Sequence, residues 1–367
     1  MKIFLHRLIS NPKERLLHKI LLVPLSFLAI LYGWVIKTRI FFYQKGIYRT
    51  HSLSCKVISV GNITMGGTGK TPFVILLAGM IRDKGYRTAV LSRGYKGEYA
   101  GPYGVVSDGE NTLLDAVQAG DEPHLLAQKL RGVPIVVGKE RWVSGRFVLE
   151  QFKPQVIILD DGFQHLALKR DLDILLLDSR HPFGNGRLFP RGELREPLSQ
   201  MGRADALILT KAEEGDNINN VRKRLMISAK KIPLFQVRYE PREVRVWGEE
   251  KGQACSILKG RRVLAFAGLA QPSSFQRTLS GLGAEILKFE VFPDHHPYSA
   301  GNLDRLSREA LRAGAEAMIT TEKDMARIRF FSSPPLPLWT LAVGHEFQGN
   351  DGSLFAEFLF RRLELEP

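Results

Sequence analysis

The first residues of this sequence that are expected to do chemistry form a glycine-rich segment after a short apolar run. Residues 57–60 (VISV) lead into residues 61–71 (GNITMGGTGKT), and a helix-like stretch starts at Pro72. Glycines let backbone N–H groups turn toward phosphate oxygens, and the helix dipole adds positive potential there. Lys70 is then placed to reach the β- and γ-phosphates, and the Thr71 hydroxyl to bind Mg²⁺. The segment predicts a nucleoside triphosphate site of the P-loop type.

This loop departs from the usual eight-residue spacing at its first position, where Thr64 replaces glycine. Met65 stands where a subgroup of dimeric ATPases with doubled glycines has a lysine, so membership of that subgroup is not indicated. A glycine-rich turn before a structural helix is the alternative, but strand, loop and helix occur in the order that the motif requires. The residues expected to bind ATP are Thr64, Met65, Gly66, Gly67, Thr68, Gly69, Lys70 and Thr71.

Two adjacent carboxylates end a second apolar run. Residues 156–159 (VIIL) are followed by Asp160 and Asp161. A P-loop site needs an apolar strand that delivers a carboxylate at its carboxyl end, to hold Mg²⁺ or its water shell. An ordinary turn with solvated aspartates is the alternative, and the P-loop upstream argues against it. His165 is as consistent with a structural histidine as with a catalytic one.

Other polar clusters fall near expected strand ends, and each has a structural alternative. Asp121 and Glu122 stand at the head of a helix, where carboxylates also serve as caps. Arg93, Arg191 and Arg195 lie in basic loops that suit the anionic groups of a substrate and suit a solvated surface equally well.

Two further clusters lie in the second half of the chain. Residues 292–298 (FPDHHPY) follow an expected strand. Adjacent side chains of an extended segment point in opposite directions, so at most one of His295 and His296 is expected to act. Residues 320–324 (TTEKD) close another expected strand and are equally consistent with a solvated surface.

Short apolar runs that alternate with helix-like segments indicate the fold. The first unit has expected strands at 56–60, 88–92, 134–137, 156–159, 174–177 and 206–209, and expected helices at 72–84, 124–131 and 140–152. Nearly continuous Val, Ile and Leu runs are typical of parallel strands that are buried on both faces. The pattern predicts an α/β fold, a P-loop NTPase-type doubly wound parallel sheet with helices on both faces. Its ligand is expected at the carboxyl edge of the strands.

The first 50 residues combine positive charge with an uncharged apolar run. They hold nine Lys or Arg and one acidic residue, in a chain of 367 residues with a net charge of +14. Residues 20–36 (ILLVPLSFLAILYGWVI) are at the short limit for a bilayer span, which takes about 20 residues. A helix in the membrane interface would keep both basic flanks against anionic lipid, with Phe27, Tyr32 and Trp34 at headgroup depth. A spanning helix, which would carry one basic flank across the bilayer, and a buried core helix are the alternatives.

A second, smaller α/β unit is expected to begin near residue 240. Loop-like residues 213–220 and 239–252 precede it. Its expected strands are 262–267, 285–291, 317–320 and 337–342, and its expected helices are 273–282 and 303–313. An amphipathic helix at 354–363 could pack on either unit. We divide the chain into a membrane-associated helical segment (1–50), a P-loop catalytic domain (51–238), a smaller α/β domain with linker strands (239–350) and a C-terminal helix (351–367).

Composition and charge exclude several classes of protein. With 44% hydrophobic and 25% charged residues, the chain is globular rather than disordered or fibrous. Two cysteines, Cys55 and Cys255, exclude a disulfide framework and indicate a reducing compartment. The positive charge favours a phosphate or a membrane surface as partner. Nucleic acid is not expected, because the excess charge lies beside the apolar run and no basic stripe with interleaved aromatic residues occurs elsewhere.

Seven motifs, in their order, resemble those of the tetraacyldisaccharide 4′-kinase family, the lipid A 4′-kinases. They are VGNITMGGTGKTP, LSRGY, AGDEP, LDDGFQH, RGELREP, FPDHH and TTEKD. The resemblance implies an enzyme of two α/β domains at the cytoplasmic face of the inner membrane. Its reaction would transfer the γ-phosphate of ATP to the 4′-hydroxyl of an anionic glycolipid, a tetraacylated glucosamine disaccharide 1-phosphate, giving lipid IVA.

The resemblance also implies roles for individual residues. Asp121 is similar to the family's catalytic base, with His295 as its dyad partner from the second domain. Asp160, with Asp161 and Glu122 nearby, corresponds to the acidic Mg²⁺ site. Two other classes stay open: a membrane-docked P-loop ATPase acting as a regulatory switch, and a nucleic-acid-binding ATPase suggested by the high pI.

Overall fold

The computed structural model describes residues 22–95, 97–211, 232–249, 251–269, 272–294, 296–328 and 335–365. Its strands are β1 (Lys56–Asn62), β2 (Thr88–Ser92), β3 (Gly104–Ser107), β4 (Ile135–Val137), β5 (Val156–Asp160), β6 (Leu172–Asp178), β7 (Ala206–Thr210), β8 (Leu234–Val246), β9 (Arg262–Ala267), β10 (Glu285–Val291), β11 (Ala317–Thr321) and β12 (Leu338–Phe347). Its α-helices are α3 (Val23–Gln44), α4 (Lys70–Asp83), α5 (Ala116–Ala119), α6 (Asp121–Lys129), α7 (Arg141–Phe152), α9 (Pro272–Gly281), α10 (Ala300–Ala313), α11 (Glu322–Met325) and α12 (Asp351–Leu363). In these residues the strand order is β10-β9-β11-β12-β8-β7-β6-β1-β5-β2-β4-β3.

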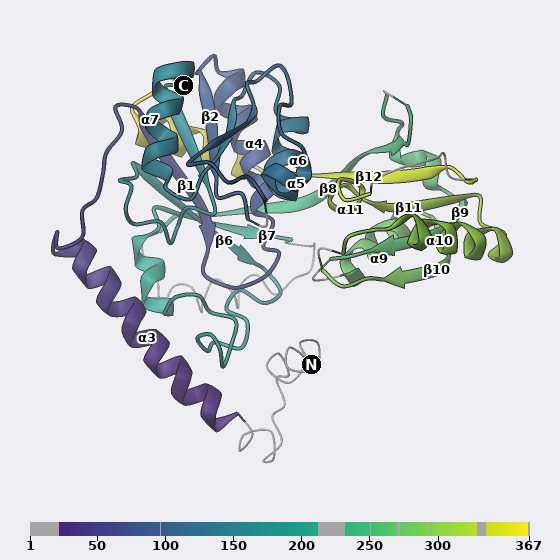
Figure 1. Cartoon of the computed structure of the whole chain (residues 1–367), viewed down its shortest axis with the longest axis horizontal. Helices are drawn as coiled ribbons and strands as arrows, with labels where there is room; N and C mark the ends of the chain where they lie inside the picture. The colour runs from purple at the N-terminus through teal and green to yellow at the C-terminus, as the bar shows by residue number, and fades with distance from the viewer. Residues whose placement is uncertain are drawn as a thin grey trace.

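Two lobes share this sheet. In Figure 1 the larger lobe surrounds β1 and β6 at the left, the smaller lobe surrounds β9 and β10 at the right, and β8 and β12 run between them. The prediction of a doubly wound P-loop-type sheet with a second, smaller α/β unit is confirmed. The expected domain boundary at residues 238 and 239 falls inside β8.

Parallel strands that are buried on both faces form the larger lobe. β1 pairs in parallel with β5 and β6, and β2 pairs in parallel with β4 and β5. Every residue of β5 and β6 is buried, which explains their continuous apolar sequences. All six strands expected here are present. The short edge strand β3, antiparallel to β4, was not predicted, because four residues are too few to show a period.

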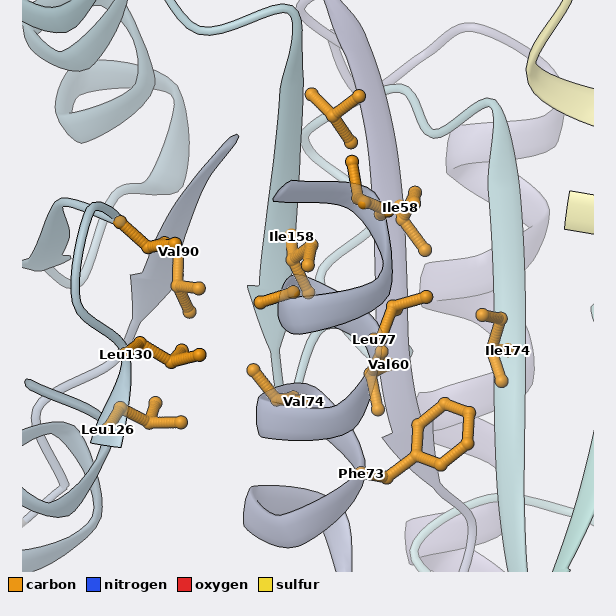
Figure 2. Close-up of a cluster of buried hydrophobic side chains, with 14 of the residues drawn as sticks. Ile58, Val60, Phe73, Val74, Leu77, Val90, Leu126, Leu130, Ile158 and Ile174 are labelled. Atoms are coloured by element: carbon orange, nitrogen blue, oxygen red, sulfur yellow. The ribbon is translucent and has the colours of Figure 1, made fainter. Parts of the chain in front are cut away.

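Helix α4 packs on one face of this sheet. Figure 2 shows Phe73, Val74 and Leu77 of α4 among Ile58 and Val60 of β1, and all five side chains are fully buried. Truncating a buried leucine to alanine typically costs about 2–5 kcal/mol. This packing fixes the N-terminus of α4 at the end of β1, where the P-loop lies.

Strands β8 and β12 connect the lobes. Leu234, Phe235 and Gln236 of β8 pair in parallel with β7, whereas residues 237–246 pair antiparallel with β12. The expected loop at 239–252 is therefore wrong for residues 239–246. Charged and apolar residues alternate in β8 because one face of the strand is exposed, and this raised polarity resembles that of a loop. The other expected loop, 213–220, lies outside the described residues.

The smaller lobe has helices on both faces of its parallel strands. β9, β10 and β11 occur as expected and pair in parallel, and β12 pairs in parallel with β11. Helix α9 packs on one face and α10 on the other. The chain then returns along β12, and α12 joins the core of the larger lobe, where the Phe355 ring lies 5.1 Å from that of Phe235.

Helix α3 lies at the side of the larger lobe and is mostly exposed. Only 17% of its most apolar 18-residue window is buried, and by length and composition it could cross a membrane. The exposed large side chains between residues 23 and 41 are Val23, Phe27, Leu28, Ile30, Leu31, Trp34, Val35 and Phe41. The buried-core alternative for this segment is therefore wrong. Tyr32 Oη donates to the Arg195 carbonyl at 2.8 Å, and Arg39 Nη2 donates to the Gln164 carbonyl at 3.1 Å.

Candidate functional site

The P-loop joins β1 to α4 and is held by its own side chains. β1 ends at Asn62, and α4 begins at Lys70 after Gly69, whose φ of 82° is left-handed. Asn62 Nδ2 donates to Thr68 Oγ1 at 2.9 Å, and Lys70 Nζ donates to Asn62 Oδ1 at 3.3 Å. The loop is therefore ordered around its lysine, with the helix N-terminus behind it.

The carboxyl ends of β6 and β7 support the same loop. Lys211 Nζ donates to the Gly67 carbonyl at 2.7 Å and to Asp178 Oδ2 at 2.6 Å. Thr210 Oγ1 donates to the Thr68 carbonyl at 2.9 Å. Sequence reasoning missed Lys211 and Asp178, although each stands at the carboxyl end of an apolar strand, where ligand-site residues collect.

The linker strands contact the loop from another side. A Cβ at Gly69 would lie 2.7 Å from His345 Cε1 and 2.9 Å from Tyr239 Oη, so only glycine fits there. His345 is 2% exposed, and burial together with the charge of Lys211 lowers its pKa to about 3. The imidazole is therefore neutral, and neither ring nitrogen has a hydrogen-bond partner among the described residues.

Asp160 is buried at the end of β5, next to β1. It pairs with Val60 in the sheet register and is 1% exposed. Ser92 Oγ donates to its Oδ2 at 3.0 Å, while Oδ1 has no hydrogen-bond partner in the described part of the chain. Burial, followed by the charges of Glu122 and Asp161, raises the pKa of Asp160 to about 6.

Asp161 is held by cations. Arg195 Nη1 donates to both of its carboxylate oxygens at 2.9 Å, and Lys70 Nζ lies 3.4 Å from its Oδ1. Burial acts to raise the pKa of the Asp161 carboxyl, but Lys70 and Arg195 outweigh it and hold the pKa below its ordinary value. Asp161 therefore stays ionised beside the loop lysine.

The donor set at this edge fits Mg²⁺. Mg²⁺ commonly binds one or two carboxylates and completes its shell with water and substrate phosphates. The unpartnered Oδ1 of Asp160 and the hydroxyl of Thr71, buried in the first turn of α4, are oxygen ligands of the kind it prefers. Among the described residues no three His, Cys, Asp or Glu side chains gather as a protein-only metal cluster.

Helix α6 brings two more carboxylates toward the phosphate loop. Glu122 interacts electrostatically with Lys70 and Asp161. Burial acts to raise the pKa of the Glu122 carboxyl, but Lys323 and Lys70 outweigh it and hold the pKa below its ordinary value. Asp121 accepts a hydrogen bond from Arg327 Nε at 2.7 Å. Lys70, Asp161 and Glu122 thus lie together at one edge of the sheet, and Asp121 adjoins Glu122 in the first turn of α6.

His295, the expected dyad partner, lies outside the described residues, so the dyad stays a prediction. Its neighbour His296 is packed as a structural residue. Its Nε2 lies 3.1 Å from Asn302 Oδ1, and its ring lies 4.7 Å from that of Phe292. Asn302 is also the N3 residue of the capping box in which Ser299 caps the N-terminus of α10.

The expected substrate-binding arginines occupy different environments. Arg195 pairs with Asp161, whereas Arg191 is 3% exposed, so the solvated-surface alternative is wrong for Arg191. The loop that carries both is bridged to the P-loop, since Met65 N–H donates to the Glu193 carbonyl at 2.7 Å. Arg93 acts electrostatically on His165. The assignment of Arg93, Arg191 and Arg195 to substrate binding stays a prediction.

His165 has a strongly shifted pKa. Burial, followed by the charges of Arg141 and Arg170, lowers its pKa to about 4. The imidazole is therefore neutral at physiological pH.

A cavity of about 820 Å³ opens where the lobes meet. It is bounded by the ends of β6 and β7, the linker strands and α9, with the lining residues Arg180, Lys211, Arg238, Tyr239, Ser274, Arg277, Thr278, Glu346, Phe347, Gln348 and Gly349. Lys211 connects it directly to the P-loop. Its position and basic lining suit the remainder of a nucleotide whose phosphates lie on the loop.

Comparison with known proteins shows the family to which this chain belongs. The family model described as tetraacyldisaccharide-1-P 4′-kinase matches residues 18–364. The protein named tetraacyldisaccharide 4′-kinase from Desulfatibacillum aliphaticivorans is 41% identical over 349 residues, covering 93% of this chain and 92% of that one. Its namesake from Pelobacter propionicus is 42% identical, covering 87% and 85%.

A solved structure agrees as well. LpxK from Aquifex aeolicus, crystallised in complex with ATP, superimposes with a TM-score of 0.74 at 34% identity, covering 93% of this chain and 98% of that one. The resemblance seen in the motifs is confirmed over nearly the whole chain. This protein belongs to the tetraacyldisaccharide-1-P 4′-kinase family.

Proposed function

We propose that this protein phosphorylates the 4′-hydroxyl of a tetraacylated disaccharide 1-phosphate, with ATP as the phosphate donor, as a step of lipid A biosynthesis. The observation that carries the proposal is the meeting of Lys70, Asp160 and the acidic head of α6 at one edge of the sheet. A loop lysine and an acidic strand end are the parts that phosphoryl transfer requires.

The proposed reaction uses these residues as follows. The 4′-oxygen attacks the γ-phosphorus of ATP, and the bond between that phosphorus and the β–γ bridging oxygen breaks, which releases ADP. Lys70 and the N–H groups of the loop balance the charge that develops on the phosphoryl oxygens. Asp121 takes the proton of the hydroxyl, with His295 as the expected dyad partner.

The same edge of the sheet offers positions for the rest of the nucleotide and for its cation. We assign the base and ribose to the cavity beside Lys211, between the linker strands and α9. We assign Mg²⁺ to Asp160 and Thr71, with Asp161 and Glu122 alongside. When bound, the cation neutralises charge on the β- and γ-phosphates.

Helix α3 links this site to a membrane surface. Its apolar face is exposed, and its other face contacts the Arg195 carbonyl through Tyr32. The Arg195 side chain reaches Asp161, which lies beside Lys70. A helix lying in the interface would let the acyl chains stay in the bilayer while the 4′-end of the glycolipid reaches the loop. We therefore favour interfacial docking on the cytoplasmic face of the inner membrane over a spanning helix.

The test is transfer of label from γ-labelled ATP to a disaccharide-1-phosphate lipid in detergent micelles. Wild-type protein should label the lipid. The variants Lys70→Ala and Asp160→Ala should lose about 10²–10³ in kcat, with unchanged thermal melts as the folding control. Hydrolysis of ATP that is stimulated by a protein partner, with no labelled lipid, would instead identify a regulatory ATPase. Near-wild-type kcat in either folded variant would refute the placement of the phosphate site.

A further inference from the structure

Three ion pairs join the two lobes between α6 and the segment around α11. Arg327 Nε contacts Asp121 Oδ2 at 2.7 Å, and Lys323 Nζ contacts Glu122 Oε1 at 2.6 Å. Lys129, at the end of α6, pairs with Glu322. We call these three pairs the interlobe clasp.

The charge pattern of the clasp specifies one alignment of the lobes. Helix α6 presents two acids in its first turn and a base in its last, and residues 322–327 present the opposite charges to each. The Arg327 and Asp121 side chains are 6% and 17% exposed. Ion pairs from which water is largely excluded are screened much less than surface pairs. A shift of α11 along α6 would place unpaired or like charges together.

A buried carboxylate holds the arginine of the clasp. Asp324 is fully buried, and its Oδ1 lies 3.4 Å from Arg327 Nη1. The same oxygen accepts from Tyr298 Oη at 3.1 Å and from Gly268 N–H at 3.0 Å. Thr321 Oγ1 donates to Oδ2 at 2.7 Å. Arg327 therefore projects from a fixed support toward the larger lobe.

Tyr298 gives this support a second role. It ends the segment at 292–298 that carries His295, the expected partner of Asp121. One carboxylate, that of Asp324, thus contacts both the arginine that holds Asp121 and Tyr298, which lies three positions after His295 in the sequence.

We propose that Arg327 is a positioning residue for phosphoryl transfer, and that closure of the interlobe clasp sets the Asp121 carboxylate in place for the acceptor hydroxyl. The proposal rests on the proposed function, in which Asp121 is the base. The Arg327 N–H donated to Oδ2 restrains the carboxylate, and misplacing a reacting group by about 1 Å costs on the order of 100-fold in rate. Asp324 supplies the fixed geometry behind that restraint.

The first experiment reverses the Lys129–Glu322 pair, which lies outside the reacting groups. Glu322→Lys and Lys129→Glu should each lower kcat by about 10- to 100-fold, with a smaller change in KM for ATP. The double variant Lys129→Glu/Glu322→Lys should recover kcat to within a few-fold of wild type. The matched control is Glu316→Lys in the exposed Arg261–Glu316 pair of the same lobe, which should leave kcat unchanged. Single reversals with wild-type kcat, or a folded double variant without recovery, would overturn the proposal.

The second experiment tests Arg327 directly. Arg327→Met should lower kcat about as much as the single reversals, and Arg327→Lys should be milder because it keeps the charge. Arg327→Met in an Asp121→Asn background should cause little further loss, since residues that act as a unit are non-additive. If Arg327→Met fails to fold by thermal melting, recovery in the reversed pair decides the proposal.

The outcomes distinguish failure of the assigned catalytic base from failure of the interlobe clasp. Full turnover of Asp121→Asn would refute the assigned base, and with it the positioning role. Lost turnover in Asp121→Asn, together with wild-type kcat in Arg327→Met and both reversals, would refute the clasp alone. Lipid phosphorylation by the wild-type protein would then still support the proposed function.

Discussion

Replacing Gly69 by alanine puts a methyl group into space that side chains of the linker strands β8 and β12 already occupy. The new Cβ would lie 2.7 Å from His345 Cε1 and 2.9 Å from both His345 Nε2 and Tyr239 Oη. These side chains face each other across β8 and β12, since His345 and Tyr239 are partners in the register. A left-handed φ costs a non-glycine residue about 1–2 kcal/mol, and crowding in a packed site costs about 1–3 kcal/mol more. We expect Gly69→Ala to lower the free energy of unfolding by about 2–5 kcal/mol.

Two other glycines of the same loop separate the cost of the left-handed φ from the cost of crowding. Gly66 has a φ of 116° with no atom near its Cβ position, so Gly66→Ala carries the backbone cost alone. Gly67 has open space and no positive φ, so Gly67→Ala carries neither cost. In urea unfolding without nucleotide, Gly67→Ala should be the most stable of the three variants, Gly66→Ala should be intermediate and Gly69→Ala should be the least stable. His345→Ala added to Gly69→Ala should recover part of the loss. Equal stability of Gly69→Ala and Gly66→Ala would refute the contact between linker and loop.

Three other perturbations test the remaining assignments. Asp121→Ala and His295→Ala should combine non-additively, so that kcat of the double variant at saturating ATP and lipid is close to that of the worse single variant; multiplicative losses would reject the dyad. Removing residues 1–36 should release much of the protein from membranes in a flotation assay and raise the apparent KM for lipid. Labelling of residue 2 from the periplasmic side would contradict interfacial docking. The pKa of His345, lowered from 6.5 to about 3, keeps the folded imidazole neutral while the unfolded chain binds a proton. The free energy of unfolding should therefore decrease as the pH is lowered from 6.5 toward 3, by about 1.4 kcal/mol per pH unit. Measured by urea unfolding at pH 7 and pH 5, the free energy of unfolding of His345→Gln should change less between the two pH values than that of the wild type.

Local patterns were sufficient to predict most of the fold. β5 and β6 are buried on both faces, so their sequences are mostly apolar runs that can be recognised without the structure. β8 differs from these strands, because its second half pairs with β12 and leaves several of its residues exposed. The resulting polar residues, with Pro241 at a register shift, resemble a loop when they are taken without their partner strand.

The site likewise combines local motifs, which the sequence shows, with long-range contacts, which it does not show. The P-loop and the strand end at Asp160 are local motifs, and both were predicted at the right strand ends. Arg327 and His345 were missed because their roles depend on residues about 200 or more positions away in the sequence. No periodicity joins Arg327 to Asp121, and an isolated arginine after TTEKD looks like surface charge. The pairing becomes visible only when the fold brings α11 against α6.

The position of the small lobe and the geometry of the P-loop are physically linked through the linker strands. Tyr239 and His345 contact Gly69 in the middle of β8 and β12, and the same strands continue into the small lobe, where β12 pairs with β11. A rotation of that lobe bends or turns these strands, and is therefore expected to shift the side chains packed on Gly69. The linker strands and the ion pairs between α6 and the segment around α11 then constrain the same rigid-body movement from two sides. Nucleotide binding, closure of the lobes and ordering of the loop are therefore expected to depend on one another. The Gly69 variant perturbs this coupling at the phosphate loop, and the Glu322 variant perturbs it at the contact between α6 and α11.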